Sequence, residues 1–270
     1  MGKNARTSML KNVLLFDGQP ICDDLRLVMF DKDGTIIDVH HYWVSMIALR
    51  ARKFATRYCE PGASHHHFEE TLMDAMGVDL ATNRLKAEGP VGIKPRKFIV
   101  ETVAKTIQAL RKVDPTAEEI EEVFQEIDLE TAKDMRPLLR LLPGVQNFLN
   151  QCRAHDIQMA IVTTDIAPRA KAAMESLQLG HYFQAIVGSD QVRDSKPAAD
   201  LAQLAMKLCG TSPFASAMIG DHLVDVLMGR NSGVSCSIGV LTGLADSQTF
   251  QGTGCHVVES LEQLSIQQRP

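Results

Sequence analysis

Two aspartates two residues apart, Asp31 and Asp33, are the side chains best placed for chemistry. They follow the apolar residues 25–30 and precede Gly34, so we expect them where a buried strand gives way to a turn. Neighbouring carboxylates repel each other unless a cation neutralises them, and Mg²⁺ favours a few carboxylates together with phosphate oxygens. A carboxylate can also act as a nucleophile. The alternative interpretation is an ordinary solvated acidic turn.

Three further segments carry polar groups of the same kind. Thr163 ends a second apolar run, where its hydroxyl suits a phosphate oxygen, although Thr164 or Asp165 after it could equally cap a helix. Lys196 stands before Pro197 and could balance an anion, although a single lysine is more often a solvated surface group.

The third segment is Gly220-Asp221-His222-Leu223-Val224-Asp225, which follows another apolar run. It places two carboxylates four residues apart at the expected start of a helix. These acids could bind a cation, or they could only decorate a helix N-terminus, where negative charge is favourable.

The elements that must position these residues alternate along the chain. Strands are expected at residues 25–30, 158–163, 185–188, 217–220 and 237–241, with a weaker one at 256–258. Helical patterns at 145–155, 168–177, 197–208 and 224–231 separate the later strands. This alternation predicts an α/β fold with a doubly wound, parallel-sheet, Rossmann-like core, in which ligands bind at the carboxyl ends of strands.

The pattern changes after the first strand. Residues 42–58, 68–76, 96–111 and 117–126 are typical of amphipathic helices, with no strand run among them. We therefore predict an all-α cap domain at 38–142, inserted into a core formed by 1–37 and 143–270. Residues 12–24 could form a hairpin through Asp17-Gly18, and the polar tail after Ser265 is expected to fray.

The four motifs together, in this order, resemble the haloacid dehalogenase superfamily of aspartate-nucleophile phosphotransferases. The position of the inserted helices resembles the branch that includes phosphoglycolate phosphatase and β-phosphoglucomutase. Two residues depart from the pattern: His222 stands where many relatives have a small hydroxyl residue, and Thr164 stands where asparagine is frequent.

The resemblance implies a role for each motif residue. Asp31 is the nucleophile, Asp33 the general acid and base, and Thr163 and Lys196 hold the phosphoryl group. Mg²⁺ is the implied cofactor, and its implied ligands are the Asp31 carboxylate, the Asp33 carbonyl, Asp221 and Asp225, the last as a ligand or as a neighbour of one. The expected substrate-binding residues of the core are Gly34, Thr35 and Thr164.

An acidic residue at position 33 favours a phosphomonoester phosphatase or a phosphomutase, because an alkoxide leaving group needs a proton. A cap implies a small phosphorylated metabolite as the partner, since it closes over the site and contacts the leaving group.

Five cap residues are candidate substrate contacts: His40, His41, Trp43, Lys94 and Arg96. The first three follow the catalytic loop closely, and the last two belong to a basic loop rich in glycine and proline, residues 83–97. The alternatives are a structural anchor for Trp43, solvated histidines, and an ordinary basic surface loop.

Composition bounds the remaining classes of function. The 270 residues carry 28 Lys+Arg and 33 Asp+Glu, a formal charge of −5 that gives no general attraction to nucleic acid or to anionic membranes. No apolar run reaches the roughly 20 residues that span a bilayer. Six scattered cysteines predict reduced thiols and a cytoplasmic protein. No residue pattern specifies an oligomeric state.

The sequence therefore predicts a Mg²⁺-dependent phosphatase acting through an aspartyl-phosphate. The alternative is a phosphomutase of the β-phosphoglucomutase kind, which returns the phosphoryl group to a sugar. The third reading is a catalytically silent binding protein of the same fold, which the complete set of motif residues disfavours.

Overall fold

The computed structural model describes residues 11–59, 62–86, 88–91 and 94–269. The chain divides into two compact units: a helical unit, Val39–Arg140, and a core unit built from the segments on either side of it. The sequence placed these boundaries at 38 and 142. Within the described residues, no helix is long and apolar enough to cross a membrane.

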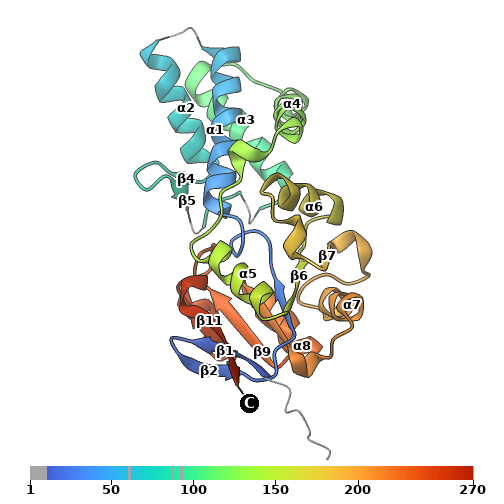
Figure 1. Ribbon diagram of the computed structural model, residues 1–270. Coiled ribbons are helices and arrows are strands. Elements are labelled where there is room, and N and C mark those ends of the chain that lie inside the picture. Colours follow the sequence, from blue (N-terminus) through green and yellow to red (C-terminus); the bar gives the residue numbers. More distant parts are fainter. Residues whose placement is uncertain (1–10, 60–61, 87, 92–93, 270) are drawn as a thin grey trace, which may run out of the picture. The chain divides into compact units, whose positions relative to one another are not determined.

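A six-stranded parallel sheet forms the centre of the core unit (Figure 1), in the order β10-β9-β8-β3-β6-β7. Its strands are β3 (Leu27–Phe30), β6 (Gln158–Val162), β7 (Ala185–Val187), β8 (Ser216–Gly220), β9 (Cys236–Val240) and β10 (His256–Val258). The apolar residues of β3, β6, β8 and β9 are buried, as expected for strands covered on both faces, whereas Ile186 of β7 and Val257 of β10, on the two edge strands, are partly exposed.

Four helices cover this sheet: α5 (Val145–Ala154), α6 (Ala167–Ser176), α7 (Asp200–Cys209) and α8 (Leu223–Ser232). Side chains alternate along β3, so that Leu27 and Met29 pack with Leu201 of α7. Phe30 points to the other face, where its ring meets Phe148 of α5 edge-on at 6.1 Å. Because successive strand residues face opposite sides, helices cover both faces, and the predicted doubly wound core is confirmed.

The order of the strands defines where a ligand would bind. From β3 the chain adds β6 and β7 on one side and then returns to place β8 on the other side of β3. The strand order therefore reverses between β3 and β8. In open α/β sheets, ligands occupy the carboxyl ends of the strands at such a switch point.

The two ends of the chain form a separate antiparallel sheet of three strands, in the order β11-β1-β2. The predicted hairpin is present as β1 (Lys11–Phe16) and β2 (Gln19–Cys22). The prediction of a fraying tail is wrong, because β11 (Leu264–Arg269) pairs with β1 along its length. Leu264 and Ile266 are buried and alternate with polar residues, a period of two that the overall polarity of the tail obscured.

The helical unit contains α1 (Val39–Tyr58), α2 (Ala63–Ala75), α3 (Arg96–Arg111) and α4 (Ala117–Lys133). Its helices pack around Phe54, Phe68 and Phe124, each almost fully buried. A capping box of Thr116 and Glu119 starts α4, and the buried Ile127 continues its apolar face beyond the predicted end at 126.

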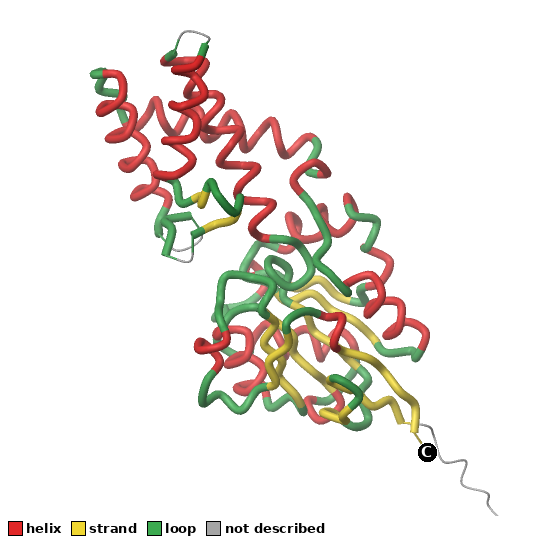
Figure 2. Tube along the Cα trace, turned by 90° about the vertical axis from the view of Figure 1, so that its left-hand side faces the viewer, coloured by secondary structure: helices red, strands yellow, loops and turns green. Residues whose placement is uncertain are grey.

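The prediction of an all-α insertion needs a correction. A small antiparallel pair, β4 (Val78–Asp79) and β5 (Arg84–Leu85), lies between α2 and α3; Figure 2 shows it as two short yellow segments. Each strand has only two residues, too few for a period-two pattern to be recognised.

Candidate active site

The four motifs meet at the carboxyl end of the parallel sheet. Asp31 follows β3, Thr163 follows β6 and Asp221 follows β8, so the three residues end adjacent strands. The Asp31 N–H extends the ladder by donating to the Ile219 carbonyl at 2.9 Å. Lys196 comes from the turns before α7, and its ammonium reaches the Asp31 carboxylate. These residues therefore gather at the switch point between β3 and β8.

Three buried carboxylates form the centre of this gathering. Asp31, Asp221 and Asp225 are only 8%, 7% and 2% exposed, and each offers an oxygen within 4.8 Å of the others. Among the residues that the structure describes, this is the one group of three or more acidic, histidine or cysteine side chains close enough to share a metal ion. Its ligands are hard oxygens, the type that Mg²⁺ and Ca²⁺ prefer.

The electrostatics show how costly this cluster is without a cation. Burial raises the pKa of Asp221 well above its ordinary value, and the neighbouring Asp31 and Asp225 raise it further. Burial also raises the pKa of Asp31, although Lys196 opposes this shift. A divalent ion would remove the repulsion that now favours protonated carboxyls.

Lys196 is the buried cation of the site, with its side chain 1% exposed. Its Nζ contacts the Asp31 carboxylate and lies 2.6 Å from Oδ1 of Asp225. Burial alone would lower the pKa of this lysine, yet the two carboxylates raise it above its usual value. Lys196 therefore stays charged, and it is no solvated surface lysine.

Two glycines let the backbone close tightly on Asp221. A Cβ at Gly34 would lie 2.3 Å from Asp221 Oδ2, and one at Gly243 would lie 1.7 Å from the same atom. Gly34 also has φ +87°, which side chains rarely tolerate. Sequence reasoning missed Gly243, because it lies in the loop after β9 and outside every motif.

Asp225 acts at the start of α8 as well as in the cluster. Its Oδ2 accepts a hydrogen bond from the His222 N–H at 2.9 Å. The imidazole Nδ1 of His222 accepts in turn from the Val224 N–H at 3.4 Å, as a helix cap. The functional and the capping interpretations of this motif are therefore compatible, and His222 replaces a small hydroxyl residue as the cap.

Asp33 forms an ion pair with a second buried lysine, Lys32, whose role the sequence did not reveal. Lys32 is 6% exposed, and its Nζ donates to both carboxylate oxygens of Asp33, at 2.7 and 2.6 Å. The same ammonium is 3.4 Å from Asp165 Oδ2. Burial raises the pKa of Asp33, and Lys32 opposes that shift. The signal in the sequence was a basic residue between two acids.

The predicted phosphate contacts of the core differ in their surroundings. The hydroxyls of Thr163 and Thr35 are buried; the first accepts from the Asp165 N–H at 3.1 Å, and the second has no hydrogen-bond partner. Thr164 is exposed. Gly34 uses its own peptide groups locally: its N–H donates to the Ile37 carbonyl and its carbonyl accepts from the Thr242 hydroxyl.

The predicted substrate contacts on α1 have partners within the helical unit. His40 is 6% exposed, and its Nδ1 accepts from the Leu85 N–H at 3.1 Å. Nε2 of His41 lies 3.2 Å from the Pro137 carbonyl. Trp43 meets the Tyr42 ring edge-on at 5.3 Å and packs beside Met46 and the other members of a small apolar cluster, Ile127 and Leu138.

The two basic candidates of the helical unit also differ. Lys94 is exposed. Arg96 begins α3 and pairs with Glu121 and Asp128 of α4, at 2.8 and 2.9 Å. Its guanidinium also stacks over the Phe124 ring. The charge of Arg96 is therefore already balanced inside the helical unit.

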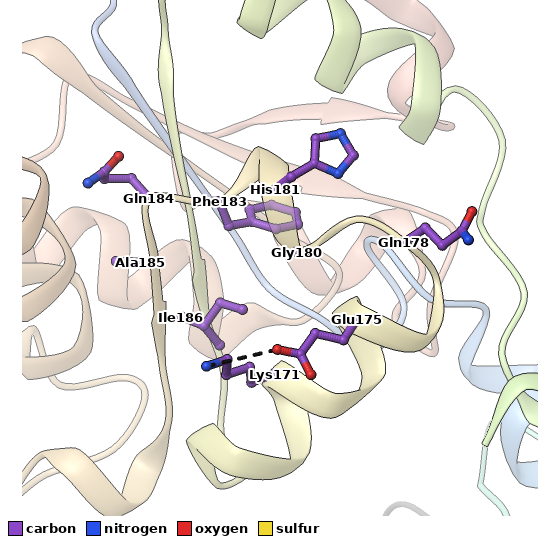
Figure 3. A pocket seen from close by; sticks show the side chains of 9 residues that line it. All are labelled: Lys171, Glu175, Gln178, Gly180, His181, Phe183, Gln184, Ala185 and Ile186. Atoms are coloured by element: carbon purple, nitrogen blue, oxygen red, sulfur yellow. Dashed lines mark ion pairs between the residues drawn. The ribbon is translucent and has the colours of Figure 1, made fainter. Parts of the chain in front are cut away.

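A cavity of about 770 Å³ lies elsewhere on the core, along α6 and β7 (Figure 3). Its lining includes Phe183, Ile186, His181 and the ion pair of Lys171 with Glu175, and it contains none of the four motifs. Its size alone does not make it a reaction site, since the convergent charged groups lie at the carboxyl ends of the strands.

Known proteins share this arrangement of sequence and fold. "Probable phosphatase IndB" of Dickeya dadantii is 26% identical over 86% of this chain and 88% of its own length. "Phosphoglycolate phosphatase 1" of Pseudomonas aeruginosa is 26% identical, over 78% of this chain and 68% of its own length. A haloacid dehalogenase superfamily hydrolase of Geobacter sulfurreducens, subfamily IA, superposes with a TM-score of 0.61 at 14% identity, covering 88% of this chain and 94% of its own.

The family model described as haloacid dehalogenase-like hydrolase matches residues 25–233, which contain all four motifs. This chain therefore belongs to the haloacid dehalogenase-like hydrolases.

Proposed function

We propose that this protein is a Mg²⁺-dependent phosphomonoester hydrolase that acts on a small phosphorylated metabolite through an aspartyl-phosphate. One observation carries the proposal: Asp31, Asp221, Asp225 and Lys196 lie together, buried, at the switch point of the sheet. Phosphoryl transfer needs positioning and charge neutralisation, and this cluster supplies a nucleophile with both signs of charge around it.

Asp31 is the proposed nucleophile. One of its carboxylate oxygens forms a bond to phosphorus while the bond from phosphorus to the leaving oxygen breaks. Its contact with Lys196 orients the carboxylate and balances the charge between it and the incoming phosphate. Thr163 and Thr35 are candidates to donate hydroxyl hydrogen bonds to the phosphoryl oxygens, and the buried Thr35 hydroxyl has no other partner.

Asp33 is the proposed general acid and base. Its side chain is 39% exposed, so a substrate can reach its carboxyl group. The surrounding protein still removes part of the water around this group, which raises its pKa, the direction that favours the protonated acid. In the first step its proton passes to the leaving alkoxide. In the second step it removes a proton from water, whose oxygen attacks phosphorus and releases Asp31.

The acidic cluster fits a divalent cation. The carboxylates of Asp31, Asp221 and Asp225, with the main-chain carbonyl of Asp33, would hold Mg²⁺. Burial and the neighbouring carboxylates raise the pKa of Asp221, and a divalent cation would oppose that shift. When bound, Mg²⁺ supplies charge neutralisation to the phosphoryl oxygens. The name of the Pseudomonas aeruginosa relative suggests phosphoglycolate as a substrate to test first.

The test is an assay of the purified protein against phosphoglycolate, hexose phosphates and an aryl phosphate, with Mg²⁺ and with excess chelator. We expect free phosphate from at least one alkyl phosphate, and only with the metal present. Full activity in chelator would refute the metal requirement. An isomerised sugar phosphate in place of free phosphate would identify a phosphomutase, and no reaction with any phosphate would favour a binding protein.

A further inference from the structure

Lys32 is a buried cation with no part in the proposed mechanism. It is 6% exposed, and its carbonyl accepts the N–H groups of Ile36 and Ile37, at 3.0 and 2.9 Å. Burying an ammonium is costly unless partners compensate for the lost water. The partners of Lys32 are therefore informative about what it does.

Two lysines divide the acids at this end of the sheet between them. Lys196 contacts Asp31 and Asp225, in the cluster that would hold phosphate and metal. Lys32 contacts Asp33 through both oxygens, and Asp165 at 3.4 Å. The ion pairs of Lys32 are thus with the general acid and with an aspartate that follows β6.

Asp165 is a fixed anchor. Its Oδ1 accepts from the Ile166 N–H at 2.8 Å and from Nε of Arg169 at 2.7 Å, and its side chain is 13% exposed. A chain of contacts therefore runs from the start of α6 through Asp165 to Lys32, and from Lys32 to Asp33. The pinned backbone of Lys32 completes the restraint.

We propose that Lys32 is a positioning residue, which fixes the carboxyl group of Asp33 for proton transfer to the leaving group. The inference rests on the proposed function, in which Asp33 is the acid. It deepens that function, because it predicts which substrates depend on Lys32. Because Lys32 contacts both carboxylate oxygens of Asp33, one contact must give way when that oxygen passes its proton to the leaving group, while the other contact holds the carboxyl group in place.

Leaving groups differ in how much they need this acid. An alkoxide, such as the one from phosphoglycolate or a sugar phosphate, is strongly basic and must be protonated as it departs, whereas 4-nitrophenolate departs without a proton. A displaced acid should therefore slow formation of the aspartyl-phosphate from alkyl phosphates and spare its formation from the aryl ester. Hydrolysis of the aspartyl-phosphate, which also uses Asp33, is common to both substrates. Loss of the fold, of the metal or of the nucleophile would slow both substrates together.

The experiment compares kcat/KM for an alkyl phosphate with kcat/KM for 4-nitrophenyl phosphate in Lys32→Met, Lys32→Arg and Asp165→Asn. This ratio reports the steps up to formation of the aspartyl-phosphate and leaves out its hydrolysis. We expect Lys32→Met to lower the alkyl rate about 10- to 100-fold and to change the aryl rate much less. Lys32→Arg should recover part of the loss, and Asp165→Asn should reproduce it at smaller size. Lys171→Met, the same change at a lysine that is 69% exposed, is the control and should alter neither rate.

A common loss of kcat/KM on both substrates, or an unchanged kcat/KM for the alkyl phosphate, would overturn the role of Lys32. If circular dichroism shows that Lys32→Met does not fold, the ratio of alkyl to aryl phosphate hydrolysis in Lys32→Arg and Asp165→Asn decides the question. Wild-type protein that hydrolyses neither substrate, or an Asp31→Asn variant that stays active, would instead overturn the proposed function and this inference with it.

Discussion

The two units of the molecule use charge in opposite ways. In the core unit the ionisable groups at the end of the sheet are buried: Asp225 is 2% exposed and the Lys196 side chain 1%. In the helical unit most ion pairs between helices lie half in water; the side chains of Arg96 and Glu121, for example, are 42% and 34% exposed. The exception is the buried Arg50, which pairs with the half-exposed Asp128.

This difference distinguishes charged groups that are expected to bind a ligand from charged groups that form ion pairs on the protein surface. Exposed pairs gain little, since water screens them and their side chains must be ordered. Burial, together with the neighbouring carboxylates, raises the pKa of Asp31 and of Asp221, and such acids destabilise a fold that holds no metal ion. We therefore expect a cation to bind at the buried acids, because they lower the stability of the free protein.

The largest expected effect comes from the nucleophile. Asp31→Asn replaces a carboxylate by an amide that cannot form the acyl-phosphate, so turnover should fall about 10³-fold or more while the fold persists. Phosphate release measures the loss, and circular dichroism checks the fold. Asp24→Asn, at an exposed turn of the core, is the matched control and should remain fully active. Retained wild-type activity, once deamidation is excluded, would sink the mechanism.

A second large effect concerns the metal. Asp221→Asn removes one carboxylate from the cluster and leaves the crowding by Gly34 and Gly243 almost unchanged, because the two side chains have nearly the same shape. We expect a loss of activity of about 10-fold or more that higher Mg²⁺ concentrations partly restore. The measurement is activity against Mg²⁺ concentration. An unchanged Mg²⁺ dependence would show that Asp221 is no ligand.

In the metal-free protein, the buried acids of the core should contribute less to stability as the pH rises. The pKa of Asp221 in the folded state lies above its unfolded value of about 3.9, so the folded protein binds the proton more tightly. Its contribution is most favourable at acid pH and declines as the pH passes from the unfolded pKa up through the raised folded pKa. Asp31 and Asp33 shift in the same direction.

Thermal unfolding across this pH range, with and without Mg²⁺, tests the argument. The decline should be smaller in Asp221→Asn, and Mg²⁺ should raise the thermal midpoint more at neutral than at acid pH. Equal stabilisation by Mg²⁺ at both pH values would contradict a site built on these carboxylates.

The same contrast explains what the sequence could predict. Asp31, Asp221 and Lys196 were found because each follows a short apolar run or precedes a helix, and the rules of parallel sheets bring such positions together. Lys32 and Gly243 were missed because their importance depends on contacts between segments that are far apart in the sequence. Lys32 lies 3.4 Å from Asp165, and the backbone of Gly243 packs closely against the Asp221 side chain. No periodicity in the chain encodes such contacts.

In the helical unit the sequence pattern predicted the helices but not the contacts that their polar side chains make. Arg96 looked like a substrate contact because it lies in a basic segment, yet it binds Glu121 and Asp128. His40 looked like a candidate ligand beside the catalytic loop, yet its Nδ1 holds the N–H of Leu85. A charged or polar residue on a helix carries little information about its role until its neighbours are known.

A moderate effect is expected at His40. His40→Ala would leave the Leu85 N–H, in a residue that is 6% exposed, without its acceptor, which should cost about 1–3 kcal/mol of stability. Urea unfolding measures the change. If His40 instead selects substrates, the variant should alter the ranking of alkyl phosphates at unchanged stability. His41→Ala, at the neighbouring histidine, is the comparison.

The smallest effect is expected at Lys53 of α1. Its ammonium lies 2.5 Å from Glu126 and 3.8 Å from Glu130, in a pair whose side chains are 37% and 48% exposed. Because water already solvates these charges, Lys53→Gln should leave the thermal midpoint and the turnover unchanged within error, in low salt and in high salt alike. Its matched partner is Lys196→Gln, which places the same amide in the buried cluster and should abolish turnover. A marked loss of stability in Lys53→Gln would mean that the surface pairs of the helical unit stabilise it more than their exposure allows.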